Sequence, residues 1–227
     1  MSNTDQRNNG CHAPHHRESQ LAAELERQKF LLAEAQRRLR NTFATIRSIM
    51  RQTASGADSV EDFVSHFAGR IDVLCRVQPT LASDPFAGFE LTGLVYEELQ
   101  VCAVREGEQF TLKGPAVRLR PRIAESIGLA IHELATNAIK FGAFAAPHGR
   151  VDIAWQTAPR GNHTWLYFDW KESGMRGRPV VEARRGFGMT LLQEALTYDL
   201  GAEVKREFAP SGFHCCIALP LPAEGER

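Results

Sequence analysis

The sequence predicts an α+β protein in which a helical hairpin precedes a two-layer sandwich of helices on a mixed or antiparallel sheet. Apolar residues recur at helical spacing up to residue 77, and from residue 89 helical segments alternate with short segments of period two. The strands follow one another too closely for repeated βαβ units. They are predicted at residues 109–113, 116–119, 150–155, 164–170, 202–208 and 213–219.

Two apolar runs separated by a turn predict the hairpin. Between residues 21 and 49 the apolar positions alternate in steps of four and three, which is the heptad pattern of a helical seam. A turn-like segment at residues 53–59 precedes a second helical run at residues 60–77. The two stripes carry more apolar surface than one hairpin can cover. We therefore expect either a homodimer that forms a four-helix bundle or docking on the next domain.

These patterns divide the chain into three segments. Residues 1–20 are expected to be a disordered tail, residues 21–82 a dimerisation domain, and residues 83–227 a mixed α/β domain that begins with a short helix near residue 91. The boundary is placed at residues 79–88, where Pro and Gly interrupt the helical pattern.

Composition excludes several classes of protein. The 27 Lys and Arg residues balance the 27 Asp and Glu residues, so no basic field favours a nucleic acid as partner. No apolar run is long enough to span a membrane and no signal peptide is visible, which predicts a cytoplasmic protein. The five cysteines are scattered without a CxxC pair and are expected to be reduced.

The segment HELATNAIKFG, residues 132–142, carries an unusual set of polar groups. On a helix that begins at Pro121, one stripe is apolar and suits packing on a sheet. Its members are Ile123, Ile127, Ala130, Ile131, Leu134, Ala138 and Phe141. Glu133, Thr136, Asn137 and Lys140 form a neighbouring polar stripe. Taken alone, such a stripe is more typical of a solvated helix face than of a site.

Two later segments change that interpretation. DWKESGM places Glu172 and Gly174 just after a predicted strand, where a carboxylate can accept from an exocyclic amine and a glycine lets a flat ring approach the backbone. RRGFGMTLL places Gly186 and Gly188 at the entry to a helix predicted at about residues 187–200, whose backbone N–H groups suit phosphates. Each segment is a weak signal alone, but the three in this order are specific for a nucleotide site.

Together the segments resemble the HWE-type histidine kinases, which are named for a His in the asparagine box and a Trp-x-Glu in the glycine box. The matching residues are His132, Trp170 and Glu172, and the resemblance extends from about residue 31 to residue 221. It implies a Bergerat-type ATP-binding sandwich and the ligands ATP and Mg²⁺. It also implies transfer of the γ-phosphoryl group to a histidine and on to a response regulator, as in two-component signalling.

The resemblance implies roles for the asparagine-box residues. Asn137 would be the Mg²⁺ ligand, Glu133 a carboxylate that orders water and metal beside it, and Lys140 a phosphate contact; His132 completes the box. A hard cation takes oxygen ligands and keeps several waters, so one amide and an outer carboxylate suffice.

The glycine boxes would hold the rest of the nucleotide. By the same resemblance, Glu172 would bind the adenine amine, with Trp170 and Gly174 beside it. Gly186 and Gly188 would shape a lid over the phosphates. The chain departs from the family at Met175, where a second glycine is common, and this change would stiffen or shorten the lid.

A larger departure lies in the hairpin. QRRLRNTFATIRSI resembles the phosphoacceptor box His-Arg-x-Lys-Asn, and matching Asn41 to the box Asn places Arg37 at the acceptor position. A guanidinium has no lone pair with which to attack a phosphate. Arg37 is either an exposed helix charge or a group that holds a phosphoryl or carboxylate group. His66, on the second helix, has the right chemistry but not the surrounding box.

Two classes of function therefore remain open. The first is a histidine kinase that phosphorylates a His on another chain or at an unrecognised site. The second is a degenerate kinase that binds a partner kinase or a response regulator as a regulatory module. A serine-directed kinase or a simple ATPase on the same fold is weaker, because the hairpin keeps so much of the phosphoacceptor box.

Overall fold

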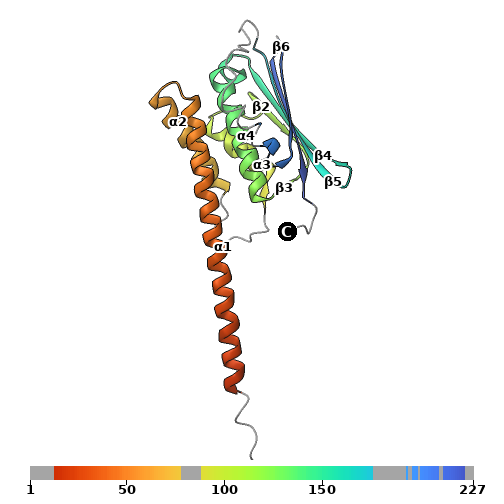
Figure 1. The fold of residues 1–227 in the computed structure, drawn as a ribbon. Helices are drawn as coiled ribbons and strands as arrows, with labels where there is room; N and C mark the ends of the chain where they lie inside the picture. Colours follow the sequence, from red (N-terminus) through yellow and green to blue (C-terminus); the bar gives the residue numbers. More distant parts are fainter. Residues whose placement is uncertain are drawn as a thin grey trace, which may run out of the picture. The chain divides into compact units, whose positions relative to one another are not determined.

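The computed structural model describes residues 13–77, 88–175, 193, 196–198, 200–209 and 212–222. The chain divides into two compact units, Met1–Ser48 and Ile49–Arg227. The predicted boundary at residues 79–88 falls almost wholly outside the described residues. The second unit begins inside the first helix and contains both the second helix and the α/β layers (Figure 1).

The described residues of the first unit belong to one helix, α1 (Ala13–Gly56), whose last turns extend into the second unit. The expectation of a disordered tail is wrong for residues 13–20, which are helical. Pro14 lies in the first turn, where its missing N–H is harmless, and the Glu, Gln and Arg residues that follow are good helix formers. The predicted turn at residue 53 is also displaced, because α1 continues to Gly56 and Thr53 Oγ1 donates to the Ile49 carbonyl at 2.7 Å.

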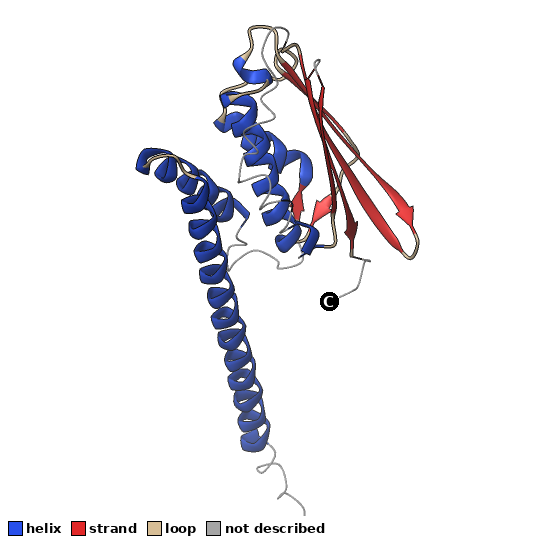
Figure 2. Ribbon diagram, turned by 45° about the horizontal axis from the view of Figure 1, so that its top comes forward, coloured by secondary structure: helices blue, strands red, loops and turns tan. Residues whose placement is uncertain are grey.

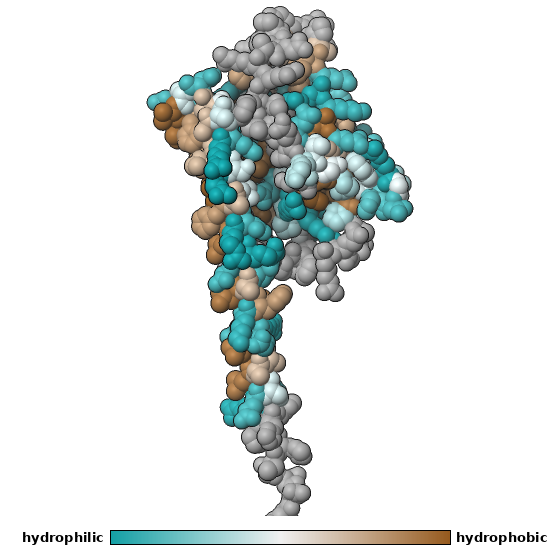
Figure 3. Space-filling model, viewed as in Figure 1, coloured by the Kyte–Doolittle hydropathy of each residue, from teal (hydrophilic) through white to brown (hydrophobic). Residues whose placement is uncertain are grey.

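The predicted apolar seam of α1 is largely exposed. Leu21, Leu25, Leu32 and Leu39 are between 52% and 66% exposed, and apolar side chains recur along the helix in Figure 3. Ile49, the last seam residue, is buried. A helical seam of this kind is covered only when another helix packs on it. The homodimer therefore remains a prediction.

Apart from the few helical residues between 193 and 200, the described part of the second unit contains three further helices and a short 3₁₀ helix. They are α2 (Val60–Val77), α3 (Leu91–Val101), α4 (Pro121–Lys140) and η1 (Ala143–Ala145). Ser59 caps α2, since its hydroxyl accepts from the Asp62 N–H at 3.0 Å. Glu90 caps α3 in the same manner through the Gly93 N–H. Among the described residues, no helix is both long enough and apolar enough to cross a membrane.

The main sheet has the strand order β2-β4-β5-β7-β6. Its strands are β2 (Phe110–Lys113), β4 (Arg150–Arg160), β5 (His163–Ser173), β6 (Glu203–Ala209) and β7 (Gly212–Leu221). β2 runs parallel to β4 and the other neighbours are antiparallel. The short strands β1 (Phe89–Glu90) and β3 (Arg118–Leu119) form a separate pair. The predicted mixed sheet is confirmed.

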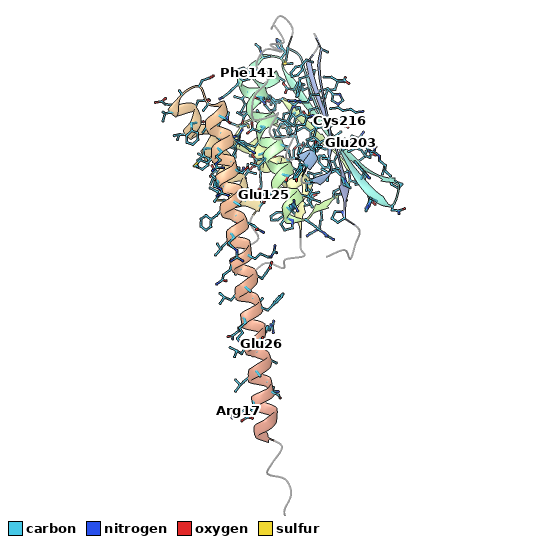
Figure 4. The ribbon with its side chains drawn as sticks, viewed as in Figure 1. Arg17, Glu26, Glu125, Phe141, Glu203 and Cys216 are labelled. Atoms are coloured by element: carbon cyan, nitrogen blue, oxygen red, sulfur yellow. The ribbon has the colours of Figure 1, made fainter. Side chains whose placement is uncertain are left out.

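Helices α3 and α4 form one layer on the sheet, as Figures 1 and 2 show. The apolar stripe of α4 is buried as predicted, except for Phe141, which is 52% exposed just past the helix end (Figure 4). Alternate residues of the strands complete the core: Val151, Ile153, Trp155, Leu166, Phe168 and Trp170. This is the two-layer α+β architecture predicted. The helix predicted at residues 187–200 is described only at residues 193, 196–198 and 200, which are helical.

Candidate functional site

The polar stripe of α4 faces α2. Glu133 is only 6% exposed, and its Oε1 accepts from Arg70 Nε on α2 at 2.7 Å. Arg70 Nη1 donates to Thr53 Oγ1, also at 2.7 Å, so the end of α1 joins the same cluster. Because both charges are buried, each depends on its partner for compensation. Arg70 therefore fixes the position of the Glu133 carboxylate.

A second charged cluster lies at the C-terminal end of α4. Lys140 Nζ donates to Asp62 Oδ1 at 2.9 Å and lies 2.6 Å from His66 Nε2. The bond from Lys140 lowers the pKa of Asp62, which therefore stays ionised. Burial, followed by the charge of Lys140, lowers the pKa of His66. The imidazole is therefore neutral near pH 7, and its Nε2 can accept from the ammonium group.

His132, the histidine of the asparagine box, points to α2 and α3. Its Nδ1 lies 3.2 Å from Glu98 Oε2, and the other oxygen of Glu98 accepts from Arg76 Nη2 on α2. A Cβ added at Gly69 would lie 2.6 Å from the His132 ring, so α2 and the ring are in close contact. His132 therefore lies in the interface that α4 makes with α2 and α3.

Asn137 occupies the stripe between the two clusters. It follows Glu133 by one helical turn and precedes Lys140 by three residues, and its side chain is half-buried. Among the described residues its amide has no hydrogen-bond partner, and no three His, Cys, Asp or Glu side chains there are grouped as metal ligands. An amide oxygen that is completed by water and phosphate oxygens is a normal donor set for Mg²⁺. The residues present thus fit that ion.

The end of β5 is joined to the loop that follows α4. Glu172 is 4% exposed; its Oε2 accepts from the Ala143 N–H at 2.7 Å and its Oε1 from Trp170 Nε1 at 3.1 Å. Burial raises the pKa of Glu172. A side chain at Gly142 would collide with the same carboxylate, so the loop needs glycine there. The structure thus brings Glu172 close to the C-terminal end of α4.

The neighbours of Glu172 are mostly core residues. Trp170 is fully buried, and its ring meets Phe144 edge-on at 6.3 Å. Gly174 has a φ of +78°, and a Cβ there would overlap the His148 carbonyl. Met175 is buried in the core. The predicted lid glycines, Gly186 and Gly188, lie outside the described residues.

Sequence reasoning missed the partners that α2 supplies, Arg70 above all. A signal for Arg70 was present, because it lies three, four and seven residues before Val73, Leu74 and Val77, on the buried side of α2. A charge at an apolar position of a helical repeat indicates a buried ion pair. The sequence does not say which carboxylate completes that pair.

Arg37 belongs to the first unit and is held by its own helix. Its Nε and Nη2 each donate to one oxygen of Glu34 at 2.8 Å, and 59% of its side chain is exposed. The hydrogen bonds that Arg37 donates to Glu34 raise the pKa of Arg37, so it remains a cation. The side chain is thus an exposed helix charge.

Comparisons with known proteins show what the chain is similar to. Residues 34–116 match the HWE histidine kinase family. The chain is 32% identical over 203 residues to the blue-light-activated histidine kinase 1 of Erythrobacter litoralis, over 86% of this chain and 54% of that protein. It is 30% identical over 193 residues to the blue-light-activated histidine kinase of Brucella anthropi, over 84% of this chain and 39% of that protein. The chain thus spans about half of these relatives or less.

A solved structure shows the same fold. The histidine kinase domain of an Erythrobacter litoralis blue-light activated histidine kinase superimposes with a TM-score of 0.55 at 22% identity, covering 88% of this chain and 96% of that one. A longer structure of that kinase also gives a TM-score of 0.55, at 16% identity over 82% of this chain and 59% of that one. The fold is therefore that of a histidine kinase domain. Over residues 34–116 the chain is similar to the HWE histidine kinases, and both of the relatives named above are histidine kinases.

Proposed function

We propose that this protein is a two-component histidine kinase that binds ATP with Mg²⁺ and transfers the γ-phosphoryl group to a histidine and then to a response regulator. The proposal rests on one observation: the C-terminal end of α4 lies next to the end of β5. The polar stripe of α4, with Asn137 and Lys140, ends at the loop whose Ala143 N–H is bound by Glu172. This contact supports one continuous site, in which Asn137 would hold the metal, Lys140 a phosphate and Glu172 the base.

Each side chain has a definite part in this proposal. The Asn137 amide oxygen holds Mg²⁺, a hard cation that supplies charge neutralisation at the phosphates. The Lys140 ammonium binds a phosphate oxygen. Each Glu172 oxygen has a second lone pair beyond its present hydrogen bond, which can accept from the adenine amine. Arg70 holds Glu133 beside this site through Oε1.

Calorimetry tests the nucleotide site. The native chain should bind ATP only weakly without Mg²⁺ and more tightly with it, and Asn137→Ala should lose about 1–3 kcal/mol of the Mg²⁺-dependent binding. Asn162→Ala, on the exposed turn between β4 and β5, is the matched control and should bind as the native chain does. The proposal would be contradicted if the native chain did not bind ATP, or if Asn137→Ala bound ATP with Mg²⁺ equally well.

A second function is favoured by Arg37. If Arg37 occupies the acceptor position, the chain has no nucleophile in its phosphoacceptor box, and it would act as a regulatory module for a partner kinase or a response regulator. The two functions differ in one measurable respect. A kinase transfers labelled phosphate from ATP to protein, whereas a regulatory module binds ATP and leaves no label.

The exposed seam of α1 suits a homodimer, which we also propose. Leu25→Glu with Leu32→Glu places charges in the seam and should convert dimer to monomer in light scattering. Glu26→Ala, at a position exposed on the same helix (Figure 4), is the matched control and should keep the dimer. A native chain that is monomeric at about ten micromolar, a concentration at which modest interfaces form, would contradict the homodimer.

A further inference from the structure

The helix α2 presents a nucleophilic side chain to the polar stripe of α4. His66 Nε2 lies 2.6 Å from Lys140 Nζ, and 21% of the His66 side chain is exposed, so a ligand can reach it. One turn further along α2, the buried Arg70–Glu133 pair holds the helix against α4. Gly69 adds a close contact with His132. The imidazole and the proposed phosphate contact thus face each other at a fixed position along both helices.

We propose that His66 is the phosphoacceptor of this chain. The inference rests on the proposed function, because it takes ATP bound with Mg²⁺ at α4 as the phosphoryl donor. Lys140 suits both partners, since an ammonium group has three donor protons and can turn from the imidazole to a phosphate oxygen. Asp62, four residues before His66, keeps the ammonium beside the ring through its bond at 2.9 Å.

Phosphoryl transfer from ATP to His66 needs no further reactant. The Nε2 lone pair attacks the γ-phosphorus and a P–N bond forms, while the bond from that phosphorus to the oxygen that bridges to the β-phosphate breaks. ADP leaves with the electron pair, and the proton on Nδ1 passes to solvent. Burial and Lys140 lower the pKa of His66, so the lone pair is present at neutral pH once Lys140 turns to the phosphate.

Other histidines with described side chains lie elsewhere. His132 contacts Glu98, and His214 Nε2 lies 2.8 Å from Asp169 Oδ1 on the sheet. His163 is exposed at the start of β5, opposite Arg160. His148 is exposed in the loop after η1, where its backbone carbonyl lies beside Gly174. Among the histidines whose side chains the structure describes, His66 is the one that contacts Lys140. His66 is thus distinguished from the other histidines by its position next to Lys140 and not by the sequence around it.

Mapping of the phosphorylated residue tests the inference. After incubation of the full chain with labelled ATP and Mg²⁺, mass spectrometry should find acid-labile, base-stable phosphate on His66. His66→Gln should lose this label, and His163→Gln, the matched control, should keep it. Label on a different residue, or label that persists in His66→Gln, would overturn the inference. Binding of ATP by calorimetry without any label would overturn it and leave the nucleotide site standing, whereas an absence of ATP binding would overturn both.

A second experiment tests the position of His66 without phosphoryl transfer from ATP. Phosphoramidate, a small phosphoryl donor, should label both His66 and His163 in the native chain. A non-hydrolysable ATP analogue with Mg²⁺, at ten times its dissociation constant, should lower labelling of His66 about tenfold by occupancy and leave His163 unchanged. Equal labelling of His66 with and without the bound analogue would place the phosphates away from this residue and contradict the inference.

Discussion

The two sides of α4 differ in their polar contacts. On one side Ile127, Ile131 and Leu134 are buried against the sheet without any polar partner. On the other side α2 adds charged pairs to its apolar contacts, and two of these pairs are direct: Arg70 with Glu133 and Lys140 with Asp62. Apolar burial is nondirectional and stabilises with any well-packed neighbour. A buried ion pair adds little net stability, but loss of one partner is costly.

Because of this difference, the interface between α4 and the sheet is permanent, whereas a ligand can enter the interface between α4 and α2. No solute competes with the sheet for the apolar side of α4. A phosphate, by contrast, can replace a carboxylate or an imidazole as the partner of Lys140, because all three accept from an ammonium group. We infer that the interface between α2 and α4 is where nucleotide binding changes the contacts of the chain.

The largest effect is expected at the Arg70–Glu133 pair. Arg70→Met leaves a buried carboxylate without compensation and should lower the free energy of unfolding by about 3–5 kcal/mol. Urea unfolding followed by tryptophan fluorescence measures this loss. Addition of Glu133→Gln to Arg70→Met should recover most of it, because both charges are then absent. A double variant as unstable as Arg70→Met alone would refute this view of the interface.

The apolar side should respond differently. Ile131→Ala removes buried methyl groups at a site that cannot fully collapse, and should cost about 2–5 kcal/mol in the free energy of unfolding. The same urea titration applies. Ile139→Ala, on the exposed side of α4, is the matched control and should change stability by less than about 1 kcal/mol. Equal losses in the two variants would contradict the assignment of the apolar side.

Gly69 offers a test in which the sign of the effect reverses. Gly69→Ala places a methyl group 2.6 Å from the His132 ring, and should cost about 1–3 kcal/mol as the ring is displaced from Glu98. In a His132→Ala background the same change should stabilise by up to about 1 kcal/mol, because alanine favours the helix. Thermal unfolding of the four proteins measures both values. A stabilising effect in both backgrounds would show that α2 and His132 are not in contact.

The smallest effect is a pH dependence. Because His66 has a folded pKa below its ordinary value of 6.5, its contribution to stability is present above pH 6.5 and is lost as the pH falls through the window just below. Lys140 and Asp62 are the charged groups that face it directly. Asp62 has a folded pKa below 3.8, so its contribution is lost only at lower pH. His66→Gln should flatten the pH profile of unfolding near pH 6, and an imidazole NMR titration with a midpoint above 6.5 would contradict the argument.

The apolar side of α4 was predictable from the sequence, and its polar side only in part. Helical spacing grouped Ile127 and Ile131 because burial requires only that apolar residues share a face. Phe141 was misplaced because the helix ends at Lys140, where a spacing rule no longer applies. The partner of Glu133 lies 63 residues away, and pairing over such a separation leaves no local pattern. The same reason hid the contact between His66 and Lys140.

The strands were also predicted closely, while the junction of α1 and α2 was not. Period-two alternation located β4 and β5, although both strands extend beyond the predicted limits. The sequence grouped α2 with α1 in one dimerisation domain, because both are amphipathic helices joined by a short turn. In the structure the buried face of α2 packs with α4 in the second unit. Amphipathicity shows that a helix face needs a partner, but it does not identify that partner.

Hydrogen exchange of the native chain, with and without ATP and Mg²⁺, would show whether the polar stripe of α4 serves both α2 and the nucleotide. When ATP is bound, residues 60–67 of α2 should exchange faster, because Lys140 leaves Asp62 and His66 for a phosphate. The strands β4 and β5, behind the apolar side of α4, should be unchanged. Unaltered exchange at residues 60–67, under conditions where calorimetry shows ATP and Mg²⁺ bound, would contradict the shared use of this stripe.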